Sequence, residues 1–172
     1  MEYSTCIGEE LGLSDDEIQR LKLAAILHDV GKIGIPDYVL LKKGKLTDEE
    51  FETIKKHPDY GDDIVRNVKQ LQHMIPGIRH HHERYDGSGY PDGLEGNEAD
   101  IVARIIAVAD AFDAMTSDRP YRKSLNQLLA LEELKKYRGT QFDPDAVKAF
   151  MKVYRNQPTL FEETSNAENT DS

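Results

Sequence analysis

The sequence has a single cysteine, Cys6, among its 172 residues. One thiol excludes an internal disulfide framework and is typical of a protein kept in the reducing cytoplasm. No apolar run approaches the roughly 18 residues that a membrane-spanning helix requires. The N-terminal stretch MEYSTCIGEE also lacks the basic region followed by an apolar region that marks a signal peptide. We therefore expect a cytoplasmic domain without membrane contact.

Basic side chains are scarce relative to acidic ones. The chain has 22 Lys and Arg against 32 Asp and Glu, which gives a formal net charge of -10. Non-specific binding of nucleic acid depends on an excess of Lys and Arg, so this balance argues against that class of function. It does not exclude a small phosphate ligand at a site where metal ions or a local basic cluster reverse the electric field.

Alternating strand patterns and internal repeats are absent as well, whereas helical periodicity and helix-capping residues recur. Ser14 with Glu17, and Thr47 with Glu50, have the spacing of capping boxes, which predicts that a helix begins after each pair. We expect the first of these helices to end at the sequence HDVGK, with Gly31 as a left-handed residue at its C-terminus.

The second half of the chain follows the same pattern. Residues 101–116, IVARIIAVADAFDAMT, are almost wholly apolar, so we expect a central, buried helix there. Another helix is indicated by the leucines at positions 125, 128, 129 and 134. Asp143 as N-cap, with Pro144 in the first turn, predicts the start of the last helix.

The length of the chain suits one domain with a substantial core. We predict a compact, all-α, multi-helix domain over residues 1–155. Residues 156–172 are polar, acidic and almost without core residues, so we predict a disordered acidic tail.

Candidate metal ligands occur on four separate segments: His28, Asp29, His57, His81, His82 and Asp110. Asp110 lies within the most apolar helix, where an unpaired carboxylate would cost several kcal/mol or take up a proton. Such a residue should have a cation or a strong donor beside it. The stretch HHHERYDGSGYPDG, residues 80–93, contains two of these candidate histidines, although such a run is more often an exposed loop than a site.

Four imidazoles and two carboxylates are enough to hold two divalent ions, with one carboxylate bridging them and positions left for water and substrate. This mixed donor set suits iron, manganese or zinc, while the lack of thiolates disfavours a structural zinc site. Lys32 follows the HD pair closely enough to contact a phosphate, and Arg119 and Arg122 form a compact basic motif suited to phosphate. Solvated helix ends account for the same three residues.

Four long motifs in this order resemble the HD-GYP domains, a bacterial branch of the HD superfamily of metal-dependent phosphohydrolases. The motifs are HDVGKIGIP, KLTDEEFETIKKHPDYG, HHERYDGSGYPDG and VADAFDAMTSDRPYR, and the resemblance extends from about residue 3 to residue 151. It implies an all-α domain that hydrolyses cyclic di-GMP to pGpG, GMP or both. It also implies two divalent metal ions, iron first and manganese as the alternative, with zinc or nickel possible in a purified protein.

The resemblance assigns metal binding to six residues: His28, Asp29, His57, His81, His82 and Asp110. It assigns substrate binding to Lys32, Tyr90, Arg119 and Arg122, with Lys32 on the scissile phosphate. The implied mechanism is attack on phosphorus by a water that the two ions activate. In this scheme Asp29 is the bridging carboxylate, and Lys32 stabilises charge on the phosphoryl oxygens. His80 is an extra histidine, which we count as structural.

Family members often carry a further histidine ligand, and in three-metal members a glutamate, on a helix whose matching position falls before Met1 here. We therefore expect a truncated N-terminal helix, two ions rather than three, and an upstream sensory or receiver domain in the full-length protein. The truncation keeps a second interpretation open, that of a catalytically weak or inactive module that binds a cyclic dinucleotide or a protein. A different cyclic dinucleotide as substrate, and a protein partner at the GYP loop around Tyr90, are further alternatives.

Overall fold

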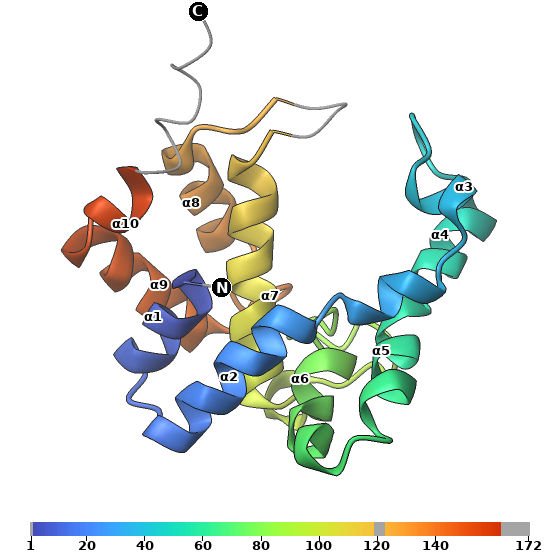
Figure 1. The fold of residues 1–172 in the computed structure, drawn as a ribbon. Coiled ribbons are helices and arrows are strands. Elements are labelled where there is room, and N and C mark those ends of the chain that lie inside the picture. The colour runs from blue at the N-terminus through green and yellow to red at the C-terminus, as the bar shows by residue number, and fades with distance from the viewer. Residues whose placement is uncertain (1, 119–122, 163–172) are drawn as a thin grey trace, which may run out of the picture.

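The computed structural model describes residues 2–118 and 123–162 (Figure 1). Within these ranges the secondary structure is helical, with two isolated β-bridges and no strand, which confirms the all-α prediction. No helix in this part of the chain is long and apolar enough to cross a membrane. The α-helices are α1 (Glu2–Glu10), α2 (Asp15–Leu27), α3 (Asp37–Leu40), α4 (Asp48–Ile54), α5 (His57–Val65), α6 (Ile75–Arg79), α7 (Ile101–Thr116), α8 (Gln127–Lys136), α9 (Pro144–Asn156) and α10 (Thr159–Glu162). Short 3-10 helices are η1 (Val30–Gly34), η2 (Lys69–Met74) and η3 (Gly96–Glu98).

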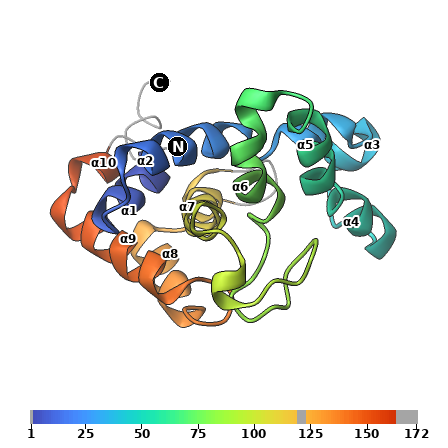
Figure 2. The ribbon, with the colours of Figure 1, turned by 90° about the horizontal axis from the view of Figure 1, so that it is seen from below.

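Helix α7 occupies the middle of the molecule, where Figure 2 shows it nearly end-on with α1, α2, α6, α8 and α9 around it. Its inward residues are buried on more than one side of the helix: Val102, Ala103, Ile105, Ile106, Val108, Ala109 and Phe112. A helix that is apolar nearly all round is stable only inside the core. The predicted central helix over residues 101–116 is therefore confirmed.

The local start signals for helices are confirmed as well. Both predicted capping boxes form, with Ser14 and Glu17 at the start of α2 and Thr47 and Glu50 at the start of α4. The Asp143 side chain accepts hydrogen bonds from the first backbone N–H groups of α9. These signals depend on residues three or four positions apart, so they can be identified without knowledge of the tertiary structure.

The prediction for Gly31 is wrong, because this residue is not a left-handed helix cap. Helix α2 ends at Leu27, and Gly31 lies in η1 with a negative φ. A Cβ atom at this position would lie 1.9 Å from the carbonyl oxygen of His57 and 2.4 Å from the amide nitrogen of Gly61. The glycine therefore allows the backbones of η1 and α5 to touch, and this contact brings the segment after α2 against the start of α5.

The prediction of a disordered tail from residue 156 does not hold for residues 156–162, which are largely helical. Asn156 still belongs to α9, and α10 follows with Phe161 only 3% exposed. The Phe161 ring stacks on Tyr3 at 5.2 Å between ring centroids and contacts Tyr154 at 4.6 Å. One aromatic side chain is thus enough to anchor a polar segment on the core. Residues 163–172 lie outside the described part of the chain.

Replacing Phe161 by alanine should lower the free energy of unfolding by about 3 kcal/mol, because it leaves a cavity among four aromatic rings. Urea denaturation measures this loss. The matched control is Leu128→Ala on α8, where the side chain is 62% exposed. The control should change stability by less than about 0.5 kcal/mol. Equal effects of the two substitutions would contradict the assignment of α10 to the core.

Candidate metal centre

The predicted ligands converge because three of the four segments that carry them lie at helix ends. His28 caps α2, Asp29 precedes η1, His57 begins α5, His81 and His82 follow α6, and Asp110 lies inside α7. Helix α6 packs on α2, α5 and α7, and η1 packs on α5. The side chains at these ends therefore face one common space.

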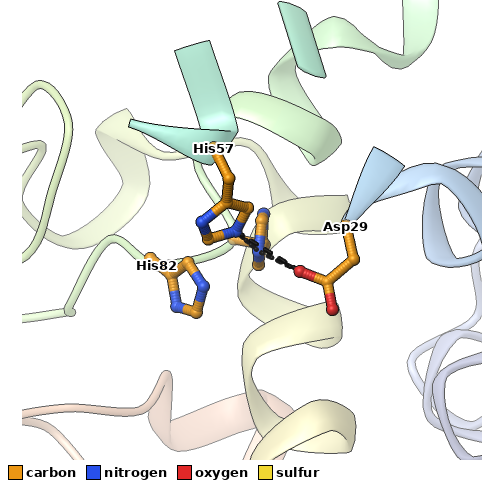
Figure 3. Close-up of side chains that lie close together, drawn as sticks. Asp29, His57 and His82 are labelled. Atoms are coloured by element: carbon orange, nitrogen blue, oxygen red, sulfur yellow. Dashed lines mark hydrogen bonds and ion pairs between the residues drawn. The ribbon is translucent and has the colours of Figure 1, made fainter. Parts of the chain in front are cut away.

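Asp29, His57, His81 and His82 form the tightest group, with one potential ligand atom from each within 4.8 Å of the others. Figure 3 shows His57 and Asp29 pointing toward one another with His82 alongside. The Oδ1 atom of Asp29 lies 3.3 Å from Nε2 of His57 and 3.9 Å from Nε2 of His81. His57 and His81 are fully buried, whereas Asp29 is partly open to solvent.

The second oxygen of Asp29 faces a different set of groups. Its Oδ2 atom lies 3.4 Å from Nε2 of His28 and 2.5 Å from Nζ of Lys32. The same His28 nitrogen is 3.9 Å from Oδ1 of Asp110. The Asp29 carboxylate therefore lies between two groups of candidate metal ligands, which is the position that a bridging carboxylate requires.

Hydrogen bonds to backbone carbonyls orient three of the histidines in the same way. The Nδ1 to oxygen distances are 2.9 Å for His28 to Ala25, 2.8 Å for His57 to Ile54, and 2.7 Å for His81 to Ile78. A carbonyl oxygen only accepts, so each Nδ1 carries the proton and donates it. In the neutral ring Nε2 is then left with its lone pair toward the centre, as in histidines that ligate metal ions.

This arrangement fits a divalent cation. Nε2 of His57 and Nε2 of His81 are only 3.3 Å apart, and two lone pairs at that distance repel unless a cation lies between them. Two imidazole nitrogens bound to one ion at about 2.1 Å, with an angle of about 90–110°, lie about 3.0–3.4 Å apart. In the described part of the chain, Nε2 of His28 is buried without a hydrogen-bond partner, as expected of an atom reserved for a metal.

The protonation states of the cluster are those that metal binding needs. Burial, followed by the charges of neighbouring histidines, holds the pKa of His81 well below its usual value. Burial and the charge of His57 lower the pKa of His82 to about 3. Burial alone would raise the pKa of Asp29, but the nearby side chains of His28, His57 and Lys32 keep this pKa far below the usual range. Neutral imidazoles and an ionised carboxylate are thus available at neutral pH.

His28 differs because its pKa is raised. Burial alone would lower it, but the nearby carboxylates of Asp29 and Asp110 outweigh burial. The space between these residues therefore favours a positive charge.

Tyr90, at the tip of the glycine-rich loop, points toward the histidines rather than away from them. Its ring stacks on the His82 ring, with 4.9 Å between centroids and 25° between planes, and Nζ of Lys55 lies 5.4 Å from its centre. Burial, then the charges of Asp29 and Asp110, raise the pKa of Tyr90 to about 12, so the hydroxyl stays protonated. His80 contacts Asp92 at 3.0 Å and stays outside the ligand cluster.

Two features of the site were not anticipated from sequence, the Lys55 ammonium beside Tyr90 and the buried carboxylate of Glu83. A glutamate directly after two ligand histidines is the signal that could have identified the second. Arg119 and Arg122, predicted to hold the phosphates of the substrate, lie outside the described residues.

Comparisons with known proteins find a matching domain family and several similar proteins. The HD domain family matches residues 1–146. The chain is 47% identical over 148 residues to the cyclic di-GMP phosphodiesterase response regulator RpfG of Xanthomonas campestris pv. campestris, covering 85% of this chain and 39% of that protein. It is 40% identical over 151 residues to the 3'3'-cGAMP-specific phosphodiesterase 2 of Vibrio cholerae, covering 87% of this chain and 29% of that protein.

A solved structure shares the fold. This is an HDG"Y"P protein from Bdellovibrio bacteriovorus, with a TM-score of 0.72, 24% identity, and coverage of 90% of this chain and 49% of that one. The chain spans less than half the length of the curated relatives described above.

Proposed function

Because this chain belongs to the HD domain family and is of the HD-GYP type, we propose that it is a metal-dependent phosphodiesterase that hydrolyses cyclic di-GMP to pGpG, GMP or both. The observation that carries this proposal is the position of Asp29 between two groups of side chains that can bind divalent cations. The identity of 47% to a relative named as a cyclic di-GMP phosphodiesterase supports the choice of substrate.

We assign the ligands to two adjacent metal positions that share Asp29. His57, His81 and His82 belong with its Oδ1 atom, and His28 and Asp110 belong with its Oδ2 atom. Nitrogen and oxygen donors without thiolates suit iron, manganese or zinc. The resemblance to the HD-GYP domains favours iron, with manganese as the alternative and zinc or nickel after purification. When bound, two such ions supply Lewis-acid polarisation of a phosphodiester and favour ionisation of water.

Lys32 supplies the positive charge that the protein itself brings to the phosphate. Its ammonium is held by Asp29 at 2.5 Å, and its side chain remains 39% exposed, so an incoming ligand can reach it. A donor fixed in advance beside the phosphoryl oxygens stabilises the charge that grows on them during in-line displacement. Tyr90, Arg119 and Arg122 remain our candidates for the other contacts to the substrate.

Replacing Lys32 by methionine should lower kcat/KM for cyclic di-GMP by about 10²–10³-fold, because the charge on the phosphoryl oxygens loses its donor. The bound metal content should stay unchanged, since Lys32 is not a ligand. The matched control is Lys42→Met, which removes an ammonium paired at the same distance of 2.5 Å with Glu50, on α4. Turnover by Lys32→Met within about threefold of the wild type would contradict the assignment.

A second candidate substrate is 3'3'-cGAMP, because the chain is 40% identical to an enzyme named for it. Incubating metal-replete protein with each cyclic dinucleotide and separating the products by chromatography decides between the two. The proposal predicts a higher kcat/KM for cyclic di-GMP, with pGpG as the first product. A nucleotide that is bound but not cut would instead identify a binding module.

Regulation by an additional domain is the final part of the proposal. The Xanthomonas relative is named a response regulator, and this chain covers 39% of it. We propose that a sensory or receiver domain accompanies the hydrolase domain in the full-length protein.

A further inference from the structure

His82 differs from the other histidines of the cluster in how its ring is held. His28, His57 and His81 each donate Nδ1–H to a backbone carbonyl, which fixes the ring plane. Among the described residues, the His82 ring makes no hydrogen bond. Histidines that bind metal ions usually have their ring fixed by a hydrogen-bond partner outside the metal site. His82 therefore needs another source of orientation.

Stacking supplies that orientation. The Tyr90 ring lies nearly parallel to the His82 ring, 4.9 Å away, whereas His57 meets it edge-on at 5.0 Å. These contacts leave the His82 imidazole little freedom to turn about its side-chain bonds. A parallel, offset pair of rings also contributes about 0.5–1.5 kcal/mol beyond the area that it buries.

Tyr90 is in turn held by the closure of its own loop. The Glu83 carboxylate is buried, and it accepts hydrogen bonds from the backbone N–H groups of Asp92 at 2.7 Å, Gly93 at 3.1 Å and Leu94 at 3.2 Å. Tyr90 also donates its backbone N–H to the carbonyl of His82 at 3.3 Å. Hydrogen bonds to a charged acceptor are the stronger class, and three of them close the loop immediately beyond Tyr90.

A second anchor acts on the same point of the loop. The Asp92 carboxylate accepts two hydrogen bonds from Arg79, at 2.9 and 3.0 Å, and lies 3.0 Å from Nε2 of His80. Arg79 and His80 directly precede the ligands His81 and His82. The loop is thus tied to both ends of the short segment that carries these ligands.

We propose that Tyr90 and Glu83 are positioning residues for His82: the Tyr90 ring fixes the orientation of the His82 imidazole, and the Glu83 carboxylate holds the loop that carries Tyr90. This inference rests on the proposed function, because it takes His82 to be a metal ligand. It assigns the Tyr90 ring, rather than its hydroxyl, to the metal centre.

Titration of the metal-free protein with Mn²⁺, followed by electron paramagnetic resonance, tests the proposal without reference to turnover. Tyr90→Ala should weaken Mn²⁺ binding by about 10–100-fold, the usual loss when an outer partner of a ligand is removed. Tyr90→Phe keeps the ring and should bind Mn²⁺ with wild-type affinity. Tyr90→Leu keeps the bulk without a flat ring and should behave like Tyr90→Ala. Thermal melting verifies that each variant is folded.

The test for Glu83 is a double-mutant cycle. Glu83→Gln should weaken Mn²⁺ binding, because its amide group places a donor against the three N–H groups. The double variant Glu83→Gln/Tyr90→Ala should bind no more weakly than Tyr90→Ala alone, since Glu83 acts through Tyr90. The control is Glu98→Gln, an exposed carboxylate that accepts one backbone N–H from Glu95, and it should leave the affinity unchanged.

Three results would overturn the proposal: wild-type affinity in Tyr90→Ala, equal losses in Tyr90→Phe and Tyr90→Ala, or additive losses in the double variant. A higher KM for cyclic di-GMP with unchanged Mn²⁺ affinity would identify Tyr90 as a substrate contact instead. The proposed function fails separately, if the wild type binds Mn²⁺ but leaves every cyclic dinucleotide intact. The affinities of the variants would still decide the roles of Tyr90 and Glu83 in that case.

Discussion

Replacing Asp29 by asparagine should lower turnover of cyclic di-GMP by about 10³-fold or more, because the change removes a carboxylate that places one oxygen near each group of candidate ligands. Asparagine has the same shape but only one oxygen and no charge. Two cations would then lie in a largely buried site with one remaining candidate carboxylate, Asp110, to balance their charge. Elemental analysis should therefore show less bound metal in the variant together with the loss of turnover.

The control for Asp29 is Asp113→Asn, which removes a carboxylate from the exposed side of α7, one turn beyond Asp110. It should keep both the metal content and kcat. Full metal loading and full turnover in Asp29→Asn would contradict the two-metal scheme. Full metal loading with lost turnover would show that the metal site is intact but that Asp29 is not its bridging ligand.

Replacing Gly31 by alanine is expected to lower the free energy of unfolding by about 3 kcal/mol or more, since the new methyl group overlaps main-chain atoms that cannot move independently. The nearest of these, the carbonyl oxygen of His57, lies 1.9 Å from the position of the added Cβ. Separating η1 from α5 also separates Asp29 from His57. Mn²⁺ affinity should therefore fall together with stability in urea denaturation.

Gly12 provides the matched control for Gly31. Its φ is +77°, and a Cβ there would meet nothing within 4 Å, so Gly12→Ala carries only backbone strain of about 1 kcal/mol. Metal binding should be unaffected in this variant. Equal stability of the two variants would show that the contact between η1 and α5 does not limit how closely Asp29 approaches His57.

The sequence predicts those features of this protein that depend on neighbouring residues. Capping boxes at Ser14 and Thr47, and the apolar helix over 101–116, follow from residue types a few positions apart, and all three are confirmed. The six candidate ligands were chosen by residue type and by resemblance, and the structure brings them to one place. Their roles in metal binding stay predictions.

What the sequence did not predict depends on contacts between distant segments. Gly31 matched the pattern of a helix cap, but its role is set by α5, about 30 positions later. The composition of residues 156–172 obscured Phe161, whose burial requires the rings of Tyr3 and Phe150. The role of Glu83 depends on the closed conformation of the loop, because its partners are backbone N–H groups that carry no sequence signal.

Anaerobic reconstitution of the metal-free protein tests the central claim most directly. The protein would be titrated with Fe²⁺ and, separately, with Mn²⁺, while bound metal and the formation of pGpG from cyclic di-GMP are measured in the same samples. The proposed function predicts no product without metal and full activity once about two ions are bound per chain. Hydrolysis by the metal-free protein, or intact cyclic di-GMP after full loading with either ion, would contradict it.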